Sequence, residues 1–222
     1  MAVGSKVWLA SFPRSGNTFL RIVLNDVFGL SSGSVYDGEA AVFAEATGVV
    51  GHVDQRPASY HSAQNDDGKP TPVKTHDLPV DNAPAIYVVR DGRAALVSYY
   101  HYLSNYGGTT YPMSDIVSGR VWPGSWSAHY RGWNPAVRKN TLLLRYEELR
   151  DDNAAACEKI GSFLGMAPLK PFEVSFADLQ KLNPRFFRSG NDGNSLAEMQ
   201  PYMDLFLKHH GATMRELGYL TD

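Results

Sequence analysis

The sequence contains one cysteine and lacks a long hydrophobic run. Cys157 cannot form an internal disulfide, and we expect it to be a small buried helix residue rather than a nucleophile. No apolar stretch approaches the ~20 residues needed to span a bilayer. The run from Val7 to Ala10 is also too short for a secretory signal peptide. These absences predict a cytoplasmic protein with no transmembrane segment.

An excess of charge of either sign is also lacking, because 21 basic residues face 23 acidic ones and the formal net charge is −2. No overall basic field therefore points to nucleic acid or to an anionic membrane, and any anion site must be local. The histidines are scattered without metal-ligand spacing, so we expect no metal. The composition, with 43% hydrophobic and 20% charged residues, is typical of a globular protein, and the length predicts a single domain over residues 1–222.

Short apolar runs alternate with helical patterns along the chain. The runs predict buried strands at 7–12, 72–75, 85–90 and 141–146. Most of them are continuously apolar or β-branched, which is typical of parallel strands that are covered on both faces. Helices are predicted at 17–29, 93–105, 125–138, 147–164 and 196–216. The alternation predicts an α/β fold, and the irregular stretches 31–71 and 106–124 are expected to be binding loops.

Residues 7–28 read as a strand, a tight turn and an amphipathic helix, which is an arrangement that binds phosphate. Gly16 permits the sharp reversal, and the first N–H groups of the helix then point at one spot. The turn adds one guanidinium and three neutral donors, on Arg14, Ser15, Asn17 and Thr18. A Walker A loop is excluded because Asn17, not lysine, follows Gly16. The alternative is a structural corner that carries an incidental arginine.

Basic side chains also follow the next two strands. Lys74 and His76 lie at the end of the second predicted strand, and Arg90 ends the third, with Ser98 two turns into the next helix. Ligands bind at the carboxyl ends of parallel strands, so these residues are expected at the same edge as the turn. Arg90 before a helix start is a second anion site, although it could simply cap a strand. Two such sites predict a P-loop-like sheet whose ligand carries two separated phosphate groups.

Taken together, these motifs resemble the cytosolic-type sulfotransferases, which use 3′-phosphoadenosine 5′-phosphosulfate (PAPS), and the chain resembles a short bacterial member. Residues 12–19 are similar to the family loop Tyr-Pro-Lys-Ser-Gly-Thr-Thr-Trp, with Arg14 in place of lysine and Phe19 in place of tryptophan. Residues 74–79 resemble the family's Lys-Thr-His-Leu-Pro stretch, whose histidine is the catalytic base. Arg90 and Ser98 match the strand and helix that bind the 3′-phosphate.

The resemblance continues through the second half of the chain. Residues 124–133 are similar to the Gly-Ser-Trp helix of the family, and Tyr146 matches the tyrosine that borders the adenine. Phe176 matches a phenylalanine that contacts the adenine. Residues 187–190 resemble the late loop that closes on the 3′-phosphate, which implies roles for Arg188, Ser189 and Gly190.

The resemblance implies sulfuryl transfer from PAPS to a hydroxyl, less readily an amine, of a small-molecule acceptor, leaving 3′,5′-adenosine bisphosphate (PAP). His76 would be the general base, Lys74 would lie near the sulfuryl group, and Arg14 with the N–H groups of residues 15–19 would hold the leaving phosphate. The implied nucleotide-binding residues are Arg14, Ser15, Gly16, Asn17, Thr18, Phe19, Arg90, Ser98, Tyr146, Phe176, Arg188, Ser189 and Gly190. The dimerisation motif of the animal enzymes is absent near residues 194–205, so no oligomeric state is predicted.

Two alternative functions stay open from the residues alone. A magnesium-dependent nucleotide kinase or hydrolase would need an acidic metal ligand, for which Asp91 is the nearest candidate. A noncatalytic homologue would bind the nucleotide without turnover. The aromatic residues of the long loops, among them Tyr36 and Trp122, either contact an acceptor or pack the loops. The remaining histidines have weaker claims than His76, and those at 209 and 210 fit core packing.

Overall fold

Five parallel strands form the sheet in the computed structural model, which describes residues 6–38, 46–53, 68–184, 186–187 and 193–221. The order across the sheet is β2-β3-β1-β4-β5. These strands are β1 (Lys6–Ser11), β2 (Gly33–Ser34), β3 (Thr71–Thr75), β4 (Ala85–Val89) and β5 (Thr141–Arg145). The predicted parallel α/β sheet is confirmed. The two-residue β2 was not predicted, because Gly-Ser carries no apolar pattern.

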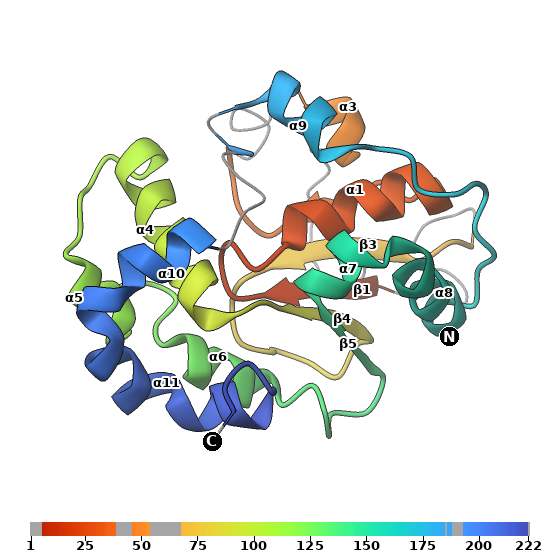
Figure 1. Cartoon of the computed structure of the whole chain (residues 1–222). Helices are drawn as coiled ribbons and strands as arrows, with labels where there is room; N and C mark the ends of the chain where they lie inside the picture. Colours follow the sequence, from red (N-terminus) through yellow and green to blue (C-terminus); the bar gives the residue numbers. More distant parts are fainter. Residues whose placement is uncertain (1–5, 39–45, 54–67, 185, 188–192, 222) are drawn as a thin grey trace.

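Helices cover both faces of the sheet, as predicted (Figure 1). Successive side chains of a strand point to opposite faces, so Leu9 and Val88 pack under α1 (Asn17–Phe28) and α8 (Asn153–Leu164). Trp8 and Tyr87 pack on the other face, against α4, α6 and α11. The bounds of those helices are Gly92–Tyr106, Trp126–Trp133 and Met203–Glu216. Double coverage explains why every residue of β1 and β4 is buried.

Several predicted helices are shorter than expected. The pattern at 147–164 forms two helices, α7 (Tyr146–Asp151) and α8, because the Asp152 backbone leaves the helical region and its carboxylate caps α8 at the Ala155 N–H. The pattern at 125–138 ends at Trp133, since Asn134 adopts a left-handed conformation with φ 43°. The pattern at 196–216 divides at Pro201 into α10 (Gly193–Met199), a short 3₁₀ turn (Gln200–Tyr202) and α11.

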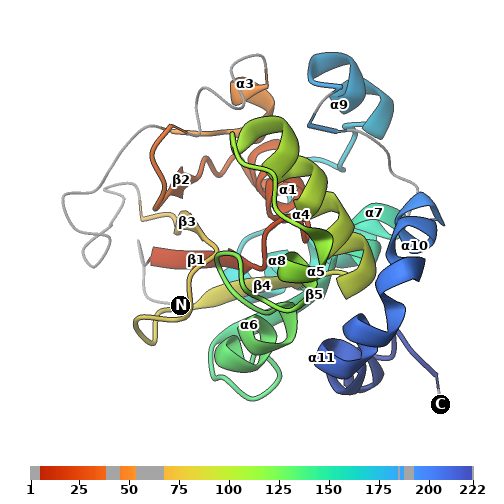
Figure 2. The same ribbon diagram turned by 90° about the vertical axis from the view of Figure 1, so that its left-hand side faces the viewer.

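Regular structure also occurs where none was predicted. The stretch 31–71 contains β2 and α3 (Thr47–Val50), and the stretch 106–124 contains α5 (Met113–Val117). The short helix α9 (Phe176–Leu182) was also not predicted. Figure 2 shows α4 crossing in front of the sheet with α10 and α11 beside it. Cys157 is buried in α8, as expected. No helix within the described ranges is long and apolar enough to cross a bilayer.

Candidate active site

A cavity of about 350 Å³ opens at the carboxyl ends of the central strands, between the start of α1 and α4. The predicted site residues that line it are Arg14, Gly16, Asn17, Thr18, Phe19, Lys74, His76, Arg90, Ser98 and Tyr146. Three of these are cationic, whereas Asp37 is the one carboxylate among the described lining residues. The structure therefore brings together side chains from three strand ends, and it gives a nearly neutral chain a local site for anions.

The turn after β1 is built around Gly16, whose φ of 106° is a conformation that side chains rarely adopt. A Cβ at this position would lie 2.6 Å from Cδ2 of Tyr146, so the glycine also lets the aromatic ring approach the turn. The Ser15 N–H donates to the Phe12 carbonyl at 3.2 Å, so the turn itself uses this group. The N–H groups that helix geometry leaves for an anion are consequently those of residues 17–19.

Two polar side chains of the turn face the protein rather than open solvent. Asn17 donates from Nδ2 to the Leu9 carbonyl at 2.8 Å and to Ser11 Oγ at 3.3 Å, which holds the turn against β1. Ser15 is fully buried and does not line the cavity, and neither its Oγ nor Asn17 Oδ1 has a partner among the described residues. The side-chain donors expected on these two residues therefore lie behind the turn.

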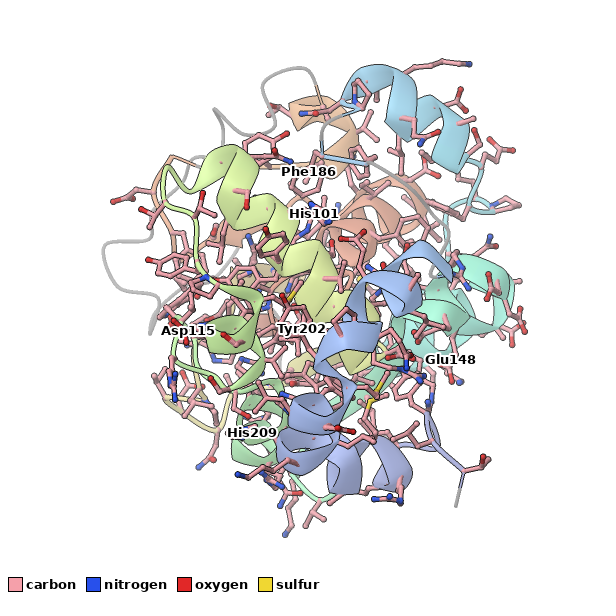
Figure 3. All side chains as sticks on the ribbon, turned by 60° about the vertical axis from the view of Figure 1, so that its left-hand side comes forward. His101, Asp115, Glu148, Phe186, Tyr202 and His209 are labelled. Atoms are coloured by element: carbon pink, nitrogen blue, oxygen red, sulfur yellow. The ribbon has the colours of Figure 1, made fainter. Side chains whose placement is uncertain are left out.

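The Arg14 side chain extends from the turn toward α4. Its Nε donates to Ser98 Oγ at 3.3 Å, and its Nη2 donates to the Phe186 carbonyl at 2.9 Å. The guanidinium also lies over the Phe186 ring, with Cζ 4.1 Å from the centroid. Figure 3 labels Phe186, which contacts Tyr102 of α4 edge-on at 6.5 Å. Phe186 was not predicted as a site residue, although the two consecutive aromatic residues at 186 and 187 are a signal that the sequence offers.

His76 is held at two points at the end of β3. Its Nδ1 lies 2.7 Å from the Ser11 carbonyl, which can only accept, so Nδ1 carries the proton and Nε2 keeps the lone pair. Its backbone N–H donates to the Tyr36 hydroxyl at 2.7 Å. Burial, followed by the charge of Lys74, lowers the pKa of His76 well below its usual 6.5. The imidazole is therefore neutral at pH 7 and can accept a proton at Nε2.

A second histidine supports this one from α6. His129 Nε2 donates to the His76 carbonyl at 2.9 Å, and the Tyr87 hydroxyl donates to His129 Nδ1 at 2.8 Å. Burial lowers the pKa of His129 to about 4, and it raises the pKa of Tyr87. Both groups are therefore neutral near pH 7. His129 was predicted to be a less suitable base than His76. Its position agrees with this prediction, because both of its ring nitrogens hydrogen-bond to the protein.

Lys74 lies beside His76, with its Nζ 5.6 Å from the centroid of the Tyr36 ring. Burial is the main cause that lowers the pKa of Lys74, and the charges of Arg21 and Arg14 lower it further. Repulsion between cations in an enclosed space favours the binding of an anion, because an anion relieves it. Tyr36 also stacks on the His76 ring, with centroids 5.8 Å apart, and Trp122 meets both rings edge-on. The end of the cavity nearest His76 is therefore aromatic.

Arg90 and Tyr146 form the other end of the cavity. The Arg90 guanidinium lies over the Tyr146 ring, with Cζ 4.5 Å from the centroid, and its Nη1 donates to the Arg14 carbonyl at 3.3 Å. Phe19 contacts Tyr146 edge-on at 6.2 Å. The two arginines predicted from separate strand ends thus lie at one edge of the sheet. This end offers a guanidinium next to a flat aromatic surface.

Four predicted nucleotide-binding groups are not placed here: Arg188, Ser189 and Gly190 lie outside the described residues, as does the side chain of Phe176. Asp91, the candidate metal ligand, instead caps α4 at the Arg93 N–H and pairs with the Arg93 side chain at 2.6 Å. Across the portion of the chain that is described, no three His, Cys, Asp or Glu side chains gather as a metal site would require.

The amino-acid sequence of this chain is similar to those of several known proteins. A family model described as the sulfotransferase domain matches residues 4–209. The 3-alpha-hydroxysteroid sulfotransferase of Cavia porcellus is 41% identical over 99 residues, which cover 41% of this chain and 34% of the relative. Sulfotransferase 2B1 of Homo sapiens is 29% identical over 170 residues, covering 72% of this chain and 46% of the relative. The matched segments thus span about a third to a half of these relatives.

Solved structures show the same fold. Mouse sulfotransferase SULT7A1 complexed with PAP superposes with a TM-score of 0.68 at 20% identity, covering 98% of this chain and 89% of that chain. Retinol dehydratase in a complex with retinol and PAP gives a TM-score of 0.66 at 17% identity, covering 94% of this chain and 81% of that chain. At sequence identities of 20% and 17%, the similarity to these two structures shows a shared fold.

Proposed function

The chain belongs to the sulfotransferase domain family, and from this membership we propose that it transfers a sulfuryl group from PAPS to a hydroxyl of a small-molecule acceptor. One observation carries the proposal. The lone pair of His76 Nε2 and the cations of Arg14, Lys74 and Arg90 belong to residues that line one cavity. A base next to an anion site is the arrangement that sulfuryl transfer from a phosphosulfate requires.

The donor would span the cavity from one cationic end to the other. The N–H groups of residues 17–19 and Arg14 would hold the 5′-phosphosulfate, and Arg90 with Ser98 would hold the 3′-phosphate. Tyr146 and Phe19 supply aromatic surface for the adenine.

The reaction would be an in-line displacement at sulfur. The acceptor oxygen forms a bond to sulfur while the bond from sulfur to the oxygen of the 5′-phosphate breaks, and the acceptor proton passes to His76 Nε2. Negative charge grows on the leaving phosphate, where Arg14 and the start of α1 would stabilise it. Lys74 would neutralise charge on the transferred group. Positioning and electrostatics supply most of the catalysis, as in phosphoryl transfer.

The acceptor would enter at the aromatic end of the cavity. Tyr36 and Trp122 lie beside His76, so a ring or another flat apolar group that carries the hydroxyl would pack between them. The neighbouring structure of retinol dehydratase contains retinol in addition to PAP. A hydroxyl on an apolar scaffold is the acceptor class that we propose for this chain. The cytoplasmic location and the absence of a nucleic-acid partner stay predictions.

The decisive experiment follows labelled sulfate from PAPS into a panel of phenols and alcohols. Transfer with release of PAP supports the proposal, whereas PAP binding without turnover on any acceptor supports the noncatalytic alternative. A thermal shift with PAP, compared with ATP and magnesium, tests the kinase or hydrolase alternative. Stabilisation by ATP and magnesium, but not by PAP, would overturn the proposed function.

A further inference from the structure

The segment that follows α11 packs against the ends of β4 and β5, next to the site. The Arg145 guanidinium donates to the Leu217 carbonyl and lies over the Tyr219 ring, with Cζ 4.9 Å from the centroid. Arg93 Nη2 donates to the Tyr219 carbonyl at 3.3 Å. These contacts hold the backbone and the ring of Tyr219, so the direction of its hydroxyl is determined by the fold.

The Tyr219 hydroxyl donates to the Glu147 carboxylate, which connects two strand ends. The phenol lies 2.8 Å from Glu147 Oε2, while Oε1 accepts from the backbone N–H of Asp91 at 3.1 Å. Burial, followed by the charge of Glu147, raises the pKa of Tyr219, so the phenol stays protonated at neutral pH and can donate. One carboxylate therefore receives two donors that come from separate parts of the chain.

The hydrogen bond between Asp91 and Glu147 joins two residues that each directly follow a residue facing the cavity. Asp91 directly follows Arg90, and Glu147 directly follows Tyr146. Arg90 and Tyr146 stack on each other at 4.5 Å, and Arg90 also donates to the carbonyl of Arg14. A shift of either strand end would change the spacing of this pair, and binding sites lose affinity when such geometry loosens.

We propose that Tyr219 is a positioning residue for the nucleotide, because it holds Glu147 and thereby keeps Arg90 and Tyr146 together. Tyr219 does not line the cavity and acts only through these neighbours. The proposal rests on the proposed function, since it concerns the same nucleotide site. Removal of the Tyr219 hydroxyl, which lies outside the cavity, should therefore reduce the free energy of nucleotide binding more than it reduces the free energy of unfolding.

The test substitutes Tyr219→Phe, which keeps the ring and removes the hydroxyl. Titration calorimetry with PAP should show a Kd about three- to tenfold higher than in the wild type, the range of one hydrogen bond. The KM for PAPS should rise in parallel, while kcat at saturating PAPS stays within about twofold. The matched control is Tyr130→Phe, whose buried phenol on α6 lies near the Glu216 carboxylate of α11 and does not line the cavity. It should lower Tm by a similar amount and leave the Kd for PAP unchanged.

A double-mutant cycle with Glu147→Ala separates positioning from simple docking of the segment. In the Glu147→Ala background, Tyr219→Phe should add no further loss of PAP affinity, because the carboxylate through which the hydroxyl would act is already removed. Additive losses would overturn the proposal, as would a Tyr219→Phe variant that binds PAP as the wild type does. If the wild-type chain does not bind PAP, the proposed function fails; if the wild type binds PAP and Tyr219→Phe binds it equally well, only this inference fails.

Discussion

Arg14 of the turn after β1 donates from Nε to the hydroxyl of Ser98 on α4, 3.3 Å away and 84 positions later in the sequence. This contact joins the two halves of the site that the sequence assigns to opposite ends of one nucleotide. Because the Ser98 oxygen accepts from Arg14, its own O–H can be donated to an anion placed nearby. Substitution of Ser98 can therefore test whether the 3′-phosphate binds at this hydroxyl.

Replacing Ser98 with alanine should weaken PAP binding about three- to tenfold, the range of one hydrogen bond, and leave 5′-AMP binding unchanged. The reason is that only PAP carries the 3′-phosphate that this hydroxyl would contact. Calorimetry with both nucleotides makes the measurement. Ser104→Ala on the same helix is the control, because the Ser104 hydroxyl bonds the Tyr100 carbonyl of its own helix and the residue does not line the cavity. An equal loss for PAP and 5′-AMP in Ser98→Ala would contradict the assignment.

Replacing His76 with alanine should lower kcat on the order of 100-fold or more while the Kd for PAP stays close to that of the wild type. The substitution removes the Nε2 lone pair but none of the cationic groups. Steady-state kinetics with labelled PAPS, together with calorimetry, separate the two effects. His209→Ala is the control, since Figure 3 shows this residue on α11 and it is not among the residues that line the cavity. A variant with nearly wild-type kcat would show that His76 is not the base.

The protonation state of His76 should depend on the nucleotide. Burial and the charges of Lys74 and Arg14 hold its pKa below 6.5, so the ring should be neutral, with the proton on Nδ1, at pH 6.5 without ligand. Bound PAP brings negative charge that offsets these cations, and the pKa should therefore rise. Nitrogen-15 NMR of the histidine ring reports both the tautomer and the titration. An unchanged or lower pKa after PAP binding would contradict the expected placement of the phosphates.

Acid should destabilise the fold through its buried histidines. Burial lowers the pKa of His129 and of His210 to about 4, so between pH 6.5 and pH 4 the unfolded chain binds protons that the folded chain excludes. The free energy of unfolding should therefore be complete above pH 6.5 and fall toward pH 4, by up to about 3 kcal/mol for each residue. Urea titrations at several pH values measure this loss.

One substitution isolates a single histidine from the other acid-sensitive groups. His210→Gln retains a donor for the Val117 carbonyl and an acceptor for the Ser127 hydroxyl, but it does not titrate. The variant should lose less stability than the wild type as the pH falls from 6.5 to 4. Parallel curves for His210→Gln and the wild type would contradict the expectation.

Gly16→Ala should abolish measurable PAP binding at concentrations that saturate the wild type. The substitution adds a Cβ at φ 106° that meets the Tyr146 ring at 2.6 Å, so both the turn and the adenine surface must move. Gly165→Ala is the matched control, because φ is also positive there, at 70°, but no atom lies within 4 Å. The control should cost about 1 kcal/mol of stability and no PAP affinity. Equal effects of the two substitutions on PAP binding would contradict the proposed role of the turn.

Local pattern in the sequence determines much of this protein. Continuous apolar runs predict the strands, because strands covered on both faces need such residues at every position. The same reasoning places Lys74, His76 and Arg90 at one edge, since parallel strands present their carboxyl ends together. Gly16 is predicted because a sharp reversal before a helix requires a backbone conformation that glycine adopts most readily. Each of these features depends on residues that are near one another in the chain.

Tertiary structure alone decides the features that depend on distant partners. The tautomer of His76 follows from the Ser11 carbonyl, 65 positions earlier. Tyr219 reaches Glu147 across 72 positions. No local pattern encodes such pairs, because a hydrogen bond between distant side chains forms only when packing brings both partners within about 3 Å. The sequence thus determines which groups reach the site edge, and packing determines their orientation and protonation.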